Sequence, residues 1–170
     1  MSTYSENIHY AMGLCTLGNI LVASSEKGIC AIFLGDDGEA VMNELRAAYP
    51  RAQLTDQQHT MQSLLEKVVA FIDTPETGVT FGLDIRGTDF QQRVWQALIA
   101  IPAGETRTYQ QIATALGDAD AVRAVAGACA ANVLAVAVPC HRVVRKDGSL
   151  SGYRWGIERK RQLLDLEARA

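Results

Sequence analysis

The sequence predicts an α/β (α+β) protein of two domains: a small antiparallel sheet with helices in residues 1–86 and a helical domain with a helix-turn-helix in residues 87–170. Residues 10–34 consist of short apolar runs separated by glycine turns, which is the pattern of antiparallel strands. Beyond Gly87 the apolar residues recur at helical spacing, and the turn residues change. The domain boundary is therefore expected near Arg86.

The first domain is expected to contain strands followed by two helices. Glycines bound the strands, and Pro50 ends the first helix because proline disfavours a helical conformation in the residue before it. The expected elements are strands at residues 20–23 and 29–34, a turn at 35–38, helices from about Glu39 to Tyr49 and from 61 to 72, and a candidate last strand at 81–85. This half holds no evident site, so we interpret it as a scaffold.

The second domain opens with helices whose boundary residues are clear. Thr88 is a candidate N-cap of a helix whose apolar stripe ends at Pro102. Thr108 is placed to cap a short helix from Tyr109 to Leu116, and Gly117 suits the left-handed residue that ends it.

The next helix is expected to start at Asp118 or Asp120 and to run through Ala131, which gives the spacing of a helix-turn-helix. It consists mainly of alanine and glycine, with Arg123 as its one long charged side chain. Two explanations of the small side chains stay open: close packing against another helix in the core, or close approach of the helix to a nucleic-acid groove.

Residues 136–144 read Val-Ala-Val-Pro-Cys-His-Arg-Val-Val and contain the strongest site candidate. The apolar run predicts a buried strand or extended segment that ends at Pro139. Cys140 follows, next to His141 and Arg142. Imidazole and cationic neighbours favour the thiolate, so we expect a nucleophilic cysteine with a lowered pKa. The competing interpretation is a small buried hydrophobe, a common place for a free cysteine.

Length and composition exclude several classes of protein. The chain has 170 residues, of which 48% are hydrophobic and 21% charged, as is typical of a globular protein rather than a disordered one. No apolar run reaches the length of a membrane span and no secretory signal is visible, which favours a cytoplasmic protein. Four cysteines, at positions 15, 30, 129 and 140, lack zinc-site spacing, so neither a disulfide nor a metal is expected.

The charge distribution differs between the two halves. Residues 1–86 hold five Lys and Arg against eleven Asp and Glu, whereas residues 87–170 hold eleven against eight. Between residues 142 and 161, seven basic residues accompany only Asp147 and Glu158. Such a patch attracts phosphates even when the whole chain is acidic, although a solvated charged face would look the same in sequence.

Residues 139–143, Pro-Cys-His-Arg-Val, with Gly148, Gly152 and Tyr153 after them, resemble the active-site motif of the alkylguanine-DNA alkyltransferases, the methylated-DNA-protein-cysteine methyltransferases. Other segments are similar to those of this family and follow the same order: residues 90–98, 101–106, 109–113, 121–125 and 151–156. Residues 1–86 look like the family's amino-terminal half, most closely that of the carboxy-terminal domain of the bacterial adaptive-response protein Ada.

This resemblance implies a ribonuclease H-like first domain and a winged-helix-like second domain that binds DNA and accepts the alkyl group. It implies direct-reversal DNA repair, in which the alkyl group on O-6 of guanine, and also on O-4 of thymine, moves irreversibly to Cys140. The damaged base would be flipped out of a duplex bound through its minor groove. A thioether has no good leaving group, so each molecule would act once, as a monomer, without a cofactor or an obligatory protein partner.

The resemblance assigns catalytic roles to four residues. Cys140 matches the alkyl acceptor, His141 its general base acting through a water molecule, and Glu167 the carboxylate that orients the imidazole. Asn132 matches the hinge asparagine that ties the DNA-binding helix to the active-site segment. The other three cysteines lack a neighbouring base and are expected to stay unmodified.

Two residues match positions that act on the DNA around the lesion. Tyr109 matches a tyrosine beside the target phosphate that also donates toward the base, and Arg123 matches the arginine that replaces the flipped nucleotide in the stack.

Four residues match positions around the lesion pocket. Tyr153 and the backbone of Val143 match its walls, and Lys160 matches a lysine beside it. Arg154 stands where some relatives carry a small hydroxyl residue, so the size of alkyl group that the pocket accepts stays open.

Two other classes of function also stay open. A Cys-His-Glu hydrolase would use the same three side chains, but it would need an oxyanion hole and would leave the helix of Arg123 without a purpose. A non-enzymatic lesion-binding protein of the alkyltransferase-like kind lacks the acceptor cysteine, so the presence of Cys140 argues against it.

Overall fold

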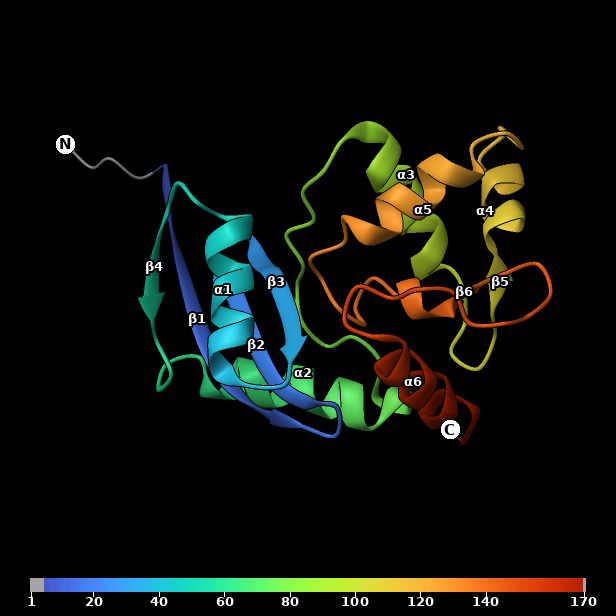
Figure 1. The fold of residues 1–170 in the computed structure, drawn as a ribbon. Coiled ribbons are helices and arrows are strands. Elements are labelled where there is room, and N and C mark those ends of the chain that lie inside the picture. The colour runs from blue at the N-terminus through green and yellow to red at the C-terminus, as the bar shows by residue number, and fades with distance from the viewer. Residues whose placement is uncertain (1–4, 170) are drawn as a thin grey trace. The chain divides into compact units, whose positions relative to one another are not determined.

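The computed structural model describes residues 5–169, and the chain divides into two compact units, Met1–Ile85 and Arg86–Ala170 (Figure 1). The first unit combines a sheet with helices, and the second is mainly helical. This arrangement confirms the predicted fold class. No helix within residues 5–169 is long and apolar enough to cross a membrane.

The sheet of the first unit has the strand order β3-β2-β1-β4. β1 (Glu6–Cys15), β2 (Gly18–Ser25) and β3 (Gly28–Gly35) pair antiparallel, as the glycine turns predict. β4 (Ala52–Asp56) adds a parallel strand beside β1 at one edge of this antiparallel sheet, and the sequence did not predict it. Only Ala52 of β4 is buried, and this edge strand therefore gives little apolar pattern in the sequence.

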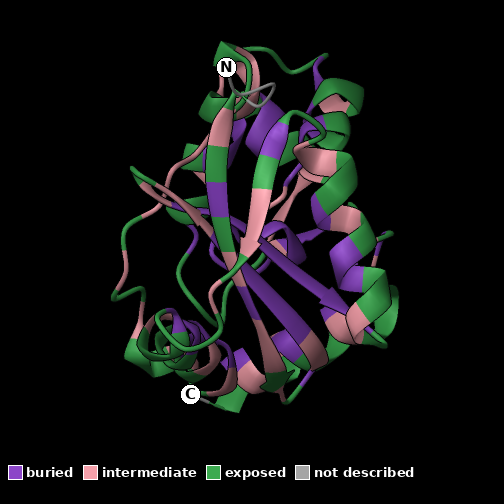
Figure 2. Cartoon of the chain, turned by 90° about the vertical axis from the view of Figure 1, so that its left-hand side faces the viewer, coloured by how far each residue is buried: buried purple, intermediate pink, exposed green. Residues whose placement is uncertain are grey.

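Two helices accompany the sheet near the expected positions. α1 spans Gly38–Ala48 and begins at Asp37, whose side chain accepts a hydrogen bond of 2.8 Å from the N–H of Ala40. α2 spans Gln62–Asp73, and the short 3₁₀ helix η1 spans Pro75–Thr77. Buried residues, purple in Figure 2, make up the middle of β2, all of β3 after its first residue, and one face each of α1 and α2.

The strand expected at residues 81–85 is not formed. Within the described chain, Leu83 makes one isolated bridge to Ile29, and the neighbouring residues are irregular. Hydrogen bonds still tie this segment to the sheet, since Asp84 donates its N–H to the carbonyl of Ile29 at 2.7 Å. A five-residue apolar pattern does not distinguish a strand from such an extended connection.

The second unit contains four α-helices within the described residues, with two short strands and a 3₁₀ helix between them. They are α3 (Asp89–Ile99), β5 (Arg107–Thr108), α4 (Tyr109–Ala115), α5 (Val122–Ala130), η2 (Cys140–Arg142), β6 (Val143–Val144) and α6 (Ile157–Arg169). α5 packs on α3 and α4, and α6 packs against η2 (Figure 1). The indole N–H of Trp95 donates to the carbonyl of Ala128 at 2.9 Å and fixes α5 on α3.

The caps of α3 and α4 are those expected. Thr88 and Thr108 each form a capping box with the glutamine three residues later, in which each side chain accepts from the other's backbone N–H. Gly117 follows α4 with a φ of 85°, the left-handed conformation that glycine adopts without strain. α5 begins after Ala121 without a side-chain cap, so the start expected at Asp118 or Asp120 is wrong.

Residues 134–140 form a buried turn instead of the expected buried strand. The N–H of Val138 donates to the carbonyl of Leu134 at 3.0 Å, and Val136 has a φ of 68°, which is rare for a β-branched residue. Pro139 then leads directly into η2. The run is apolar because it is buried, but its backbone bonds are local, and periodicity alone does not distinguish these cases.

Candidate active site

A pocket of about 410 Å³ lies in the second unit, with Cys140 in its wall. α4 contributes Tyr109, α5 contributes a row of small residues, and the segment before α6 contributes Tyr153 and Arg154. The full lining consists of Tyr109, Ala126, Cys129, Ala130, Cys140, Gly152, Tyr153 and Arg154. The turn at 134–139 and the start of η2 thus place the cysteine opposite the helix-turn-helix.

Cys140 is a buried thiol beside Asn132 and Cys129. Its Sγ accepts a hydrogen bond of 3.4 Å from Nδ2 of Asn132, and the thiol of Cys129 lines the same pocket. Burial raises the pKa of Cys140 well above its usual value, and the thiol of Cys129 adds to that rise, while Asn132 and Lys160 oppose it. The expectation of a lowered pKa is therefore wrong for the protein without DNA, because burial outweighs the neighbouring dipoles and charge.

His141 is fully buried and pairs with Glu167 rather than with the cysteine beside it. Its Nε2 hydrogen-bonds Oε1 of Glu167, while its Nδ1 is buried with no hydrogen-bond partner among residues 5–169. A carboxylate only accepts, so Nε2 carries the hydrogen and Nδ1 keeps its lone pair. Burial lowers the pKa of His141, more than Glu167 raises it, so the ring is a neutral base.

Arg142 holds the same carboxylate from the other side. Its Nε lies 3.0 and 2.8 Å from the two oxygens of Glu167, and its Nη1 donates to the carbonyl of Ile101 at 2.6 Å. Burial favours the neutral acid, but the bonds from His141 and Arg142 outweigh it and hold the pKa of Glu167 below its usual value. Glu167 is thus an anion that orients the His141 ring.

Asn132 connects the end of α5 to the turn that carries the cysteine. Its Oδ1 accepts from the N–H of Leu134 at 2.8 Å, and its Nδ2 donates to the carbonyl of Val138 at 3.0 Å. The side chain is 1% exposed. It therefore spans the turn and touches Cys140 at the same time, which is the geometry expected of a hinge residue.

Lys160 and Val143 lie behind the pocket rather than in its lining. Lys160 is fully buried, and its Nζ donates to the carbonyl of Val143 at 2.6 Å and to Oγ of Ser151 at 2.9 Å. The N–H of Val143 already donates to the carbonyl of Cys140. Burial lowers the pKa of Lys160 to about 8.

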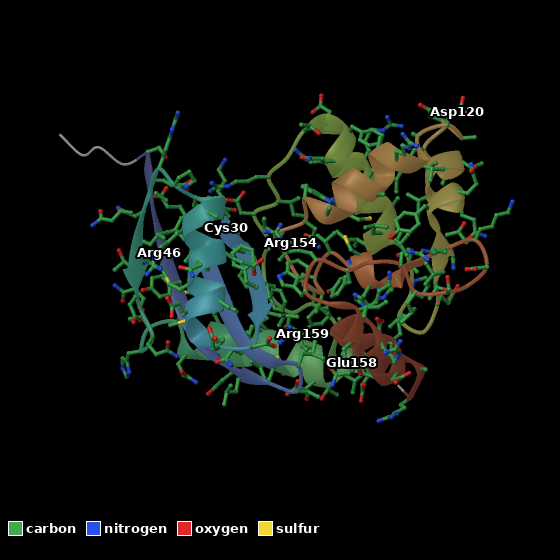
Figure 3. All side chains as sticks on the ribbon, viewed as in Figure 1. Cys30, Arg46, Asp120, Arg154, Glu158 and Arg159 are labelled. Carbon is green, nitrogen blue, oxygen red and sulfur yellow. The ribbon has the colours of Figure 1, made fainter. Side chains whose placement is uncertain are left out.

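Tyr153 and Arg154 form the wall opposite α5. The Tyr153 ring packs edge-on to His141 and to Trp155, with ring centroids 6.4 and 5.4 Å apart. Its hydroxyl is buried without a hydrogen-bond partner among the described residues. Arg154, labelled in Figure 3, donates to the carbonyl of Asn132 at 2.8 Å, and its guanidinium lies 5.4 Å from the Trp155 ring centroid. The side chain of Arg154 thus closes the pocket beside the hinge.

The small side chains of α5 face outward as well as inward. Val125 and Ala128 are buried against the unit, whereas Ala126, Gly127 and Ala130 are exposed. Arg123 is exposed three residues before Ala126 and therefore lies on the same helix face, next to the pocket. Of the two explanations for the small residues, core packing accounts only for the inner face.

The basic cluster between residues 142 and 161 is only partly a surface patch. Lys160 is buried, Arg142 is committed to Glu167, and Arg161 forms an ion pair of 2.7 Å with Glu158. The exposed basic residues are Arg145, Lys146, Arg154 and Arg161. Arg142 and Lys160, which were counted in the basic cluster, therefore contact residues of the site and do not contribute to a basic surface.

Sequence reasoning missed two pocket-side residues. Cys129 lies in the pocket beside Cys140, and its interaction with the Cys140 thiol lowers its pKa. Ser151 bonds both Tyr109 and Lys160. The helical spacing of Cys129 from Ala126 is a signal that could have placed the thiol on the pocket face, whereas nothing in the sequence distinguishes Ser151.

Between residues 5 and 169, no group of three or more His, Cys, Asp or Glu side chains is placed to hold a metal ion. The lone histidines His9 and His59 are both exposed.

Two family models match the chain. Residues 8–74 match the ribonuclease-like domain of 6-O-methylguanine DNA methyltransferase, and residues 89–169 match its DNA binding domain.

Individual relatives agree with these matches. The chain is 55% identical over 161 residues to the bifunctional transcriptional activator/DNA repair enzyme Ada of Escherichia coli, covering 95% of this chain but 46% of that protein. It is 35% identical over 173 residues to the inducible methylated-DNA--protein-cysteine methyltransferase of Bacillus subtilis, covering 96% of it. The structure of Mycobacterium tuberculosis OGT in complex with DNA is similar with a TM-score of 0.79 at 35% identity, covering 95% of this chain and 93% of that one. The chain thus spans about half the length of the Ada relatives.

Proposed function

The chain belongs to the 6-O-methylguanine DNA methyltransferase family, and from this we propose that it repairs DNA by moving the alkyl group from O-6 of alkylguanine to Cys140. O-4 of alkylthymine presents an equivalent alkyl carbon. The observation that carries the proposal is the pocket with Cys140 in its wall, backed by Asn132 and by the His141–Glu167 pair. No other cysteine has this combination of a pocket, a hinge and a base nearby among the described residues.

The buried pair supplies a proton acceptor for the reaction. Nδ1 of His141 keeps a free lone pair, and Glu167 stabilises the imidazolium that forms when the ring gains a proton. His141 makes no direct hydrogen bond with Cys140, so the thiol proton reaches it through a water molecule. The thiolate then attacks the alkyl carbon in line, and the C–O bond breaks with its electron pair going to the guanine oxygen.

The same geometry argues against a Cys-His-Glu hydrolase. A hydrolytic cysteine needs the imidazole within hydrogen-bond reach to protonate its leaving group. Nδ1 of His141 has no such bond to Cys140 here, and a thioether at Cys140 offers nothing that water can displace. Each molecule therefore acts once.

DNA binding belongs to α5 and to Tyr109 at the start of α4. The exposed row of Ala126, Gly127 and Ala130 lets the helix approach a minor groove closely, and Arg123 on the same face is placed to fill the gap left by a flipped base. The related OGT of M. tuberculosis has been solved in complex with DNA. We assign the second unit to DNA binding and alkyl acceptance, and the first to scaffolding, in a protein that acts as a monomer.

Stoichiometry tests this function. A duplex carrying O-6-methylguanine is mixed with the protein at lesion-to-protein ratios below and above one, and the remaining methylguanine is measured in the digested DNA. Repair should stop when one lesion per protein molecule has been consumed. Continued turnover would exclude transfer to the protein itself.

A further inference from the structure

A chain of hydrogen bonds links buried Lys160 to the tyrosine in the pocket. Nζ of Lys160 lies 2.9 Å from Oγ of Ser151, which lies 2.5 Å from the hydroxyl of Tyr109. Ser151 is 7% exposed and Lys160 is fully buried, so both interior links are shielded from water. These hydrogen bonds begin at Lys160 on α6 and end at Tyr109, which lines the pocket.

The charge on Lys160 favours one direction for these hydrogen bonds. An ammonium group only donates, so Oγ of Ser151 accepts from Nζ and keeps one hydrogen and one lone pair for its 2.5 Å contact with Tyr109, in which either oxygen can donate. A hydroxyl that accepts from a cation is polarised into a stronger donor, which favours donation from Ser151 to the oxygen of Tyr109. In that arrangement the phenolic hydrogen of Tyr109 is free to point into the pocket.

We propose that Ser151 and Lys160 are positioning residues that keep Tyr109 a hydrogen-bond donor toward the flipped base, and that they return a proton to Tyr109 when the base takes one. This inference rests on the proposed function of the pocket. Tyr109 is the catalytic residue of the three, because it alone lines the pocket.

The proton transfers balance those at the cysteine. When the S–C bond forms and the C–O bond breaks, the leaving guanine carries the electron pair and gains the proton of Tyr109. Ser151 gives its proton to Tyr109, and Lys160 gives one to Ser151 and becomes neutral. His141 keeps the proton that came from Cys140. At the end of the reaction His141 has therefore gained one proton and Lys160 has lost one.

The charged state of Lys160 determines the direction in which the Lys160–Ser151–Tyr109 hydrogen bonds donate. A neutral amine accepts as well as donates, so above the pKa of Lys160, about 8, the chain can reverse and draw the phenolic hydrogen away from the pocket. Burial lowers the pKa of Lys160; of the ionisable groups that face it, the thiolate forms of Cys129 and Cys140 raise this pKa and Arg145 lowers it. Burial raises the pKa of Tyr109, so its hydroxyl stays protonated at neutral pH.

Single-turnover rates across pH test the relay. The rate constant of methyl transfer from an O-6-methylguanine duplex is measured from pH 6.5 to 9.5 for the full chain and for Tyr109→Phe. The ratio of the two rates isolates the contribution of Tyr109, because titration of Cys140 and His141 affects both proteins alike. We expect the ratio to be large below about pH 8 and to fall above it.

Variants at Ser151 identify the link. Ser151→Ala should slow transfer by roughly tenfold near pH 7 and remove the fall above pH 8, since an oriented hydrogen bond is lost. Ser151→Thr keeps the hydroxyl and should restore both the rate and the pH dependence. In the Ser151→Ala, Tyr109→Phe double variant the two losses should not multiply, because both act through the same hydroxyl.

These outcomes distinguish failure of the proton relay from Lys160 through Ser151 to Tyr109 from failure of the proposed alkyl transfer to Cys140. A pH-dependent ratio that survives unchanged in Ser151→Ala, or losses that multiply in the double variant, would overturn the relay while methyl transfer itself continues. Absence of transfer in the unmodified chain would overturn the proposed function instead. DNA affinity, measured by fluorescence anisotropy, should be equal across the Ser151 variants. Ser151→Ala should lower the melting temperature, because it removes a hydrogen-bond partner of buried Lys160, so the rates are compared well below the melting temperature of every variant.

Discussion

The reactivity of Cys140 depends on groups that offset the cost of burying its charge. Its thiol is 5% exposed, and burial alone disfavours the thiolate. Asn132 and Lys160 act in the opposite direction, and His141 offers a neutral nitrogen to receive the proton. Burial therefore keeps Cys140 mainly as the neutral thiol in the protein without DNA.

Asn132→Ala should destabilise the protein and slow repair. The substitution leaves the N–H of Leu134 and the carbonyl of Val138 without their partner in a buried turn, a loss of about 1 to 3 kcal/mol. It also removes the donor to Cys140. Urea unfolding measures the first effect and single-turnover transfer the second. A variant with the stability and rate of the parent would exclude the hinge role.

The His141–Glu167 pair makes the fold sensitive to acid. The folded pKa of His141 lies below its unfolded value of about 6.5, so stability falls as pH drops through that value and the unfolded chain takes up the proton. The folded pKa of Glu167 is also depressed, so its contribution is present above the unfolded pKa and is lost as pH falls through the folded one. Melting temperature should therefore decrease below about pH 6.5, and His141→Gln should weaken that dependence between pH 5 and 7. A parallel decline in both proteins would assign the acid sensitivity to other groups.

The sequence predicted which residues form the site, but it did not predict their pKa values. The motif around Cys140 pointed to His141, Asn132 and Glu167, and the structure brings all four together. The direction of the Cys140 pKa could not be predicted, because sequence neighbours indicate adjacent charges but not burial. Cys129 and Ser151 likewise reach the site only through tertiary packing.

At the scale of elements, α5 has two different faces. Its inner face packs against α3 and α4, and its outer face carries only small side chains around Gly127. A Cβ added at Gly127 would meet no heavy atom of the described residues within 4 Å, so the outer face has room around it. Since glycine is among the poorest helix formers, selection for stability alone would not favour it there.

Gly127→Leu should therefore raise stability and lower DNA binding together. Replacing glycine in a helix interior gains roughly 1 kcal/mol, whereas the longer side chain would hold the helix away from a groove. Gly127→Ala is the matched control, with a similar gain in stability and a smaller loss of affinity. Thermal melting and duplex anisotropy measure the two effects. Unchanged affinity in Gly127→Leu would remove the α5 face from the DNA interface.

Local signals predicted the elements that depend on local chemistry. The capping boxes at Thr88 and Thr108 and the left-handed Gly117 lie at the expected positions, because caps and turns are set by neighbouring residues. β4 was missed because its pairing with β1 is decided by a distant part of the chain, and the turn at residues 134–140 was missed because an apolar run does not distinguish a strand from a buried turn. At residues 81–85 the error is the reverse: a strand was predicted from the local pattern, but the structure has only one isolated bridge there.

At the scale of the whole molecule, the chain is acidic overall, with a net charge of −3, yet its exposed basic residues include several in the second unit. Phosphate contacts release counterions, so affinity for a duplex should fall as salt rises and should depend little on sequence. This long-range attraction would supplement the short-range fit proposed for α5.

Arg123→Ala should slow repair more than it weakens binding, because in the proposed mechanism the guanidinium replaces the flipped base in the stack. Arg46→Ala, at an exposed arginine of α1, is the control for a simple loss of positive charge. Transfer rates and duplex affinities are compared for both variants at two salt concentrations. An Arg123→Ala protein that repairs at the parent rate would withdraw the flipping role from this residue.

The most direct measurement is the location of the transferred methyl group after one equivalent of methylated duplex has reacted. Residues 124–142 form one tryptic peptide that contains both Cys129 and Cys140, so fragmentation of that peptide must separate the two thiols. We predict a gain of one methylene-equivalent on Cys140 alone, its loss in Cys140→Ser, and its retention in the control Cys15→Ser. Methylation at Cys129, or a Cys140→Ser protein that still gains the methyl group, would contradict the assignment of Cys140 as the acceptor.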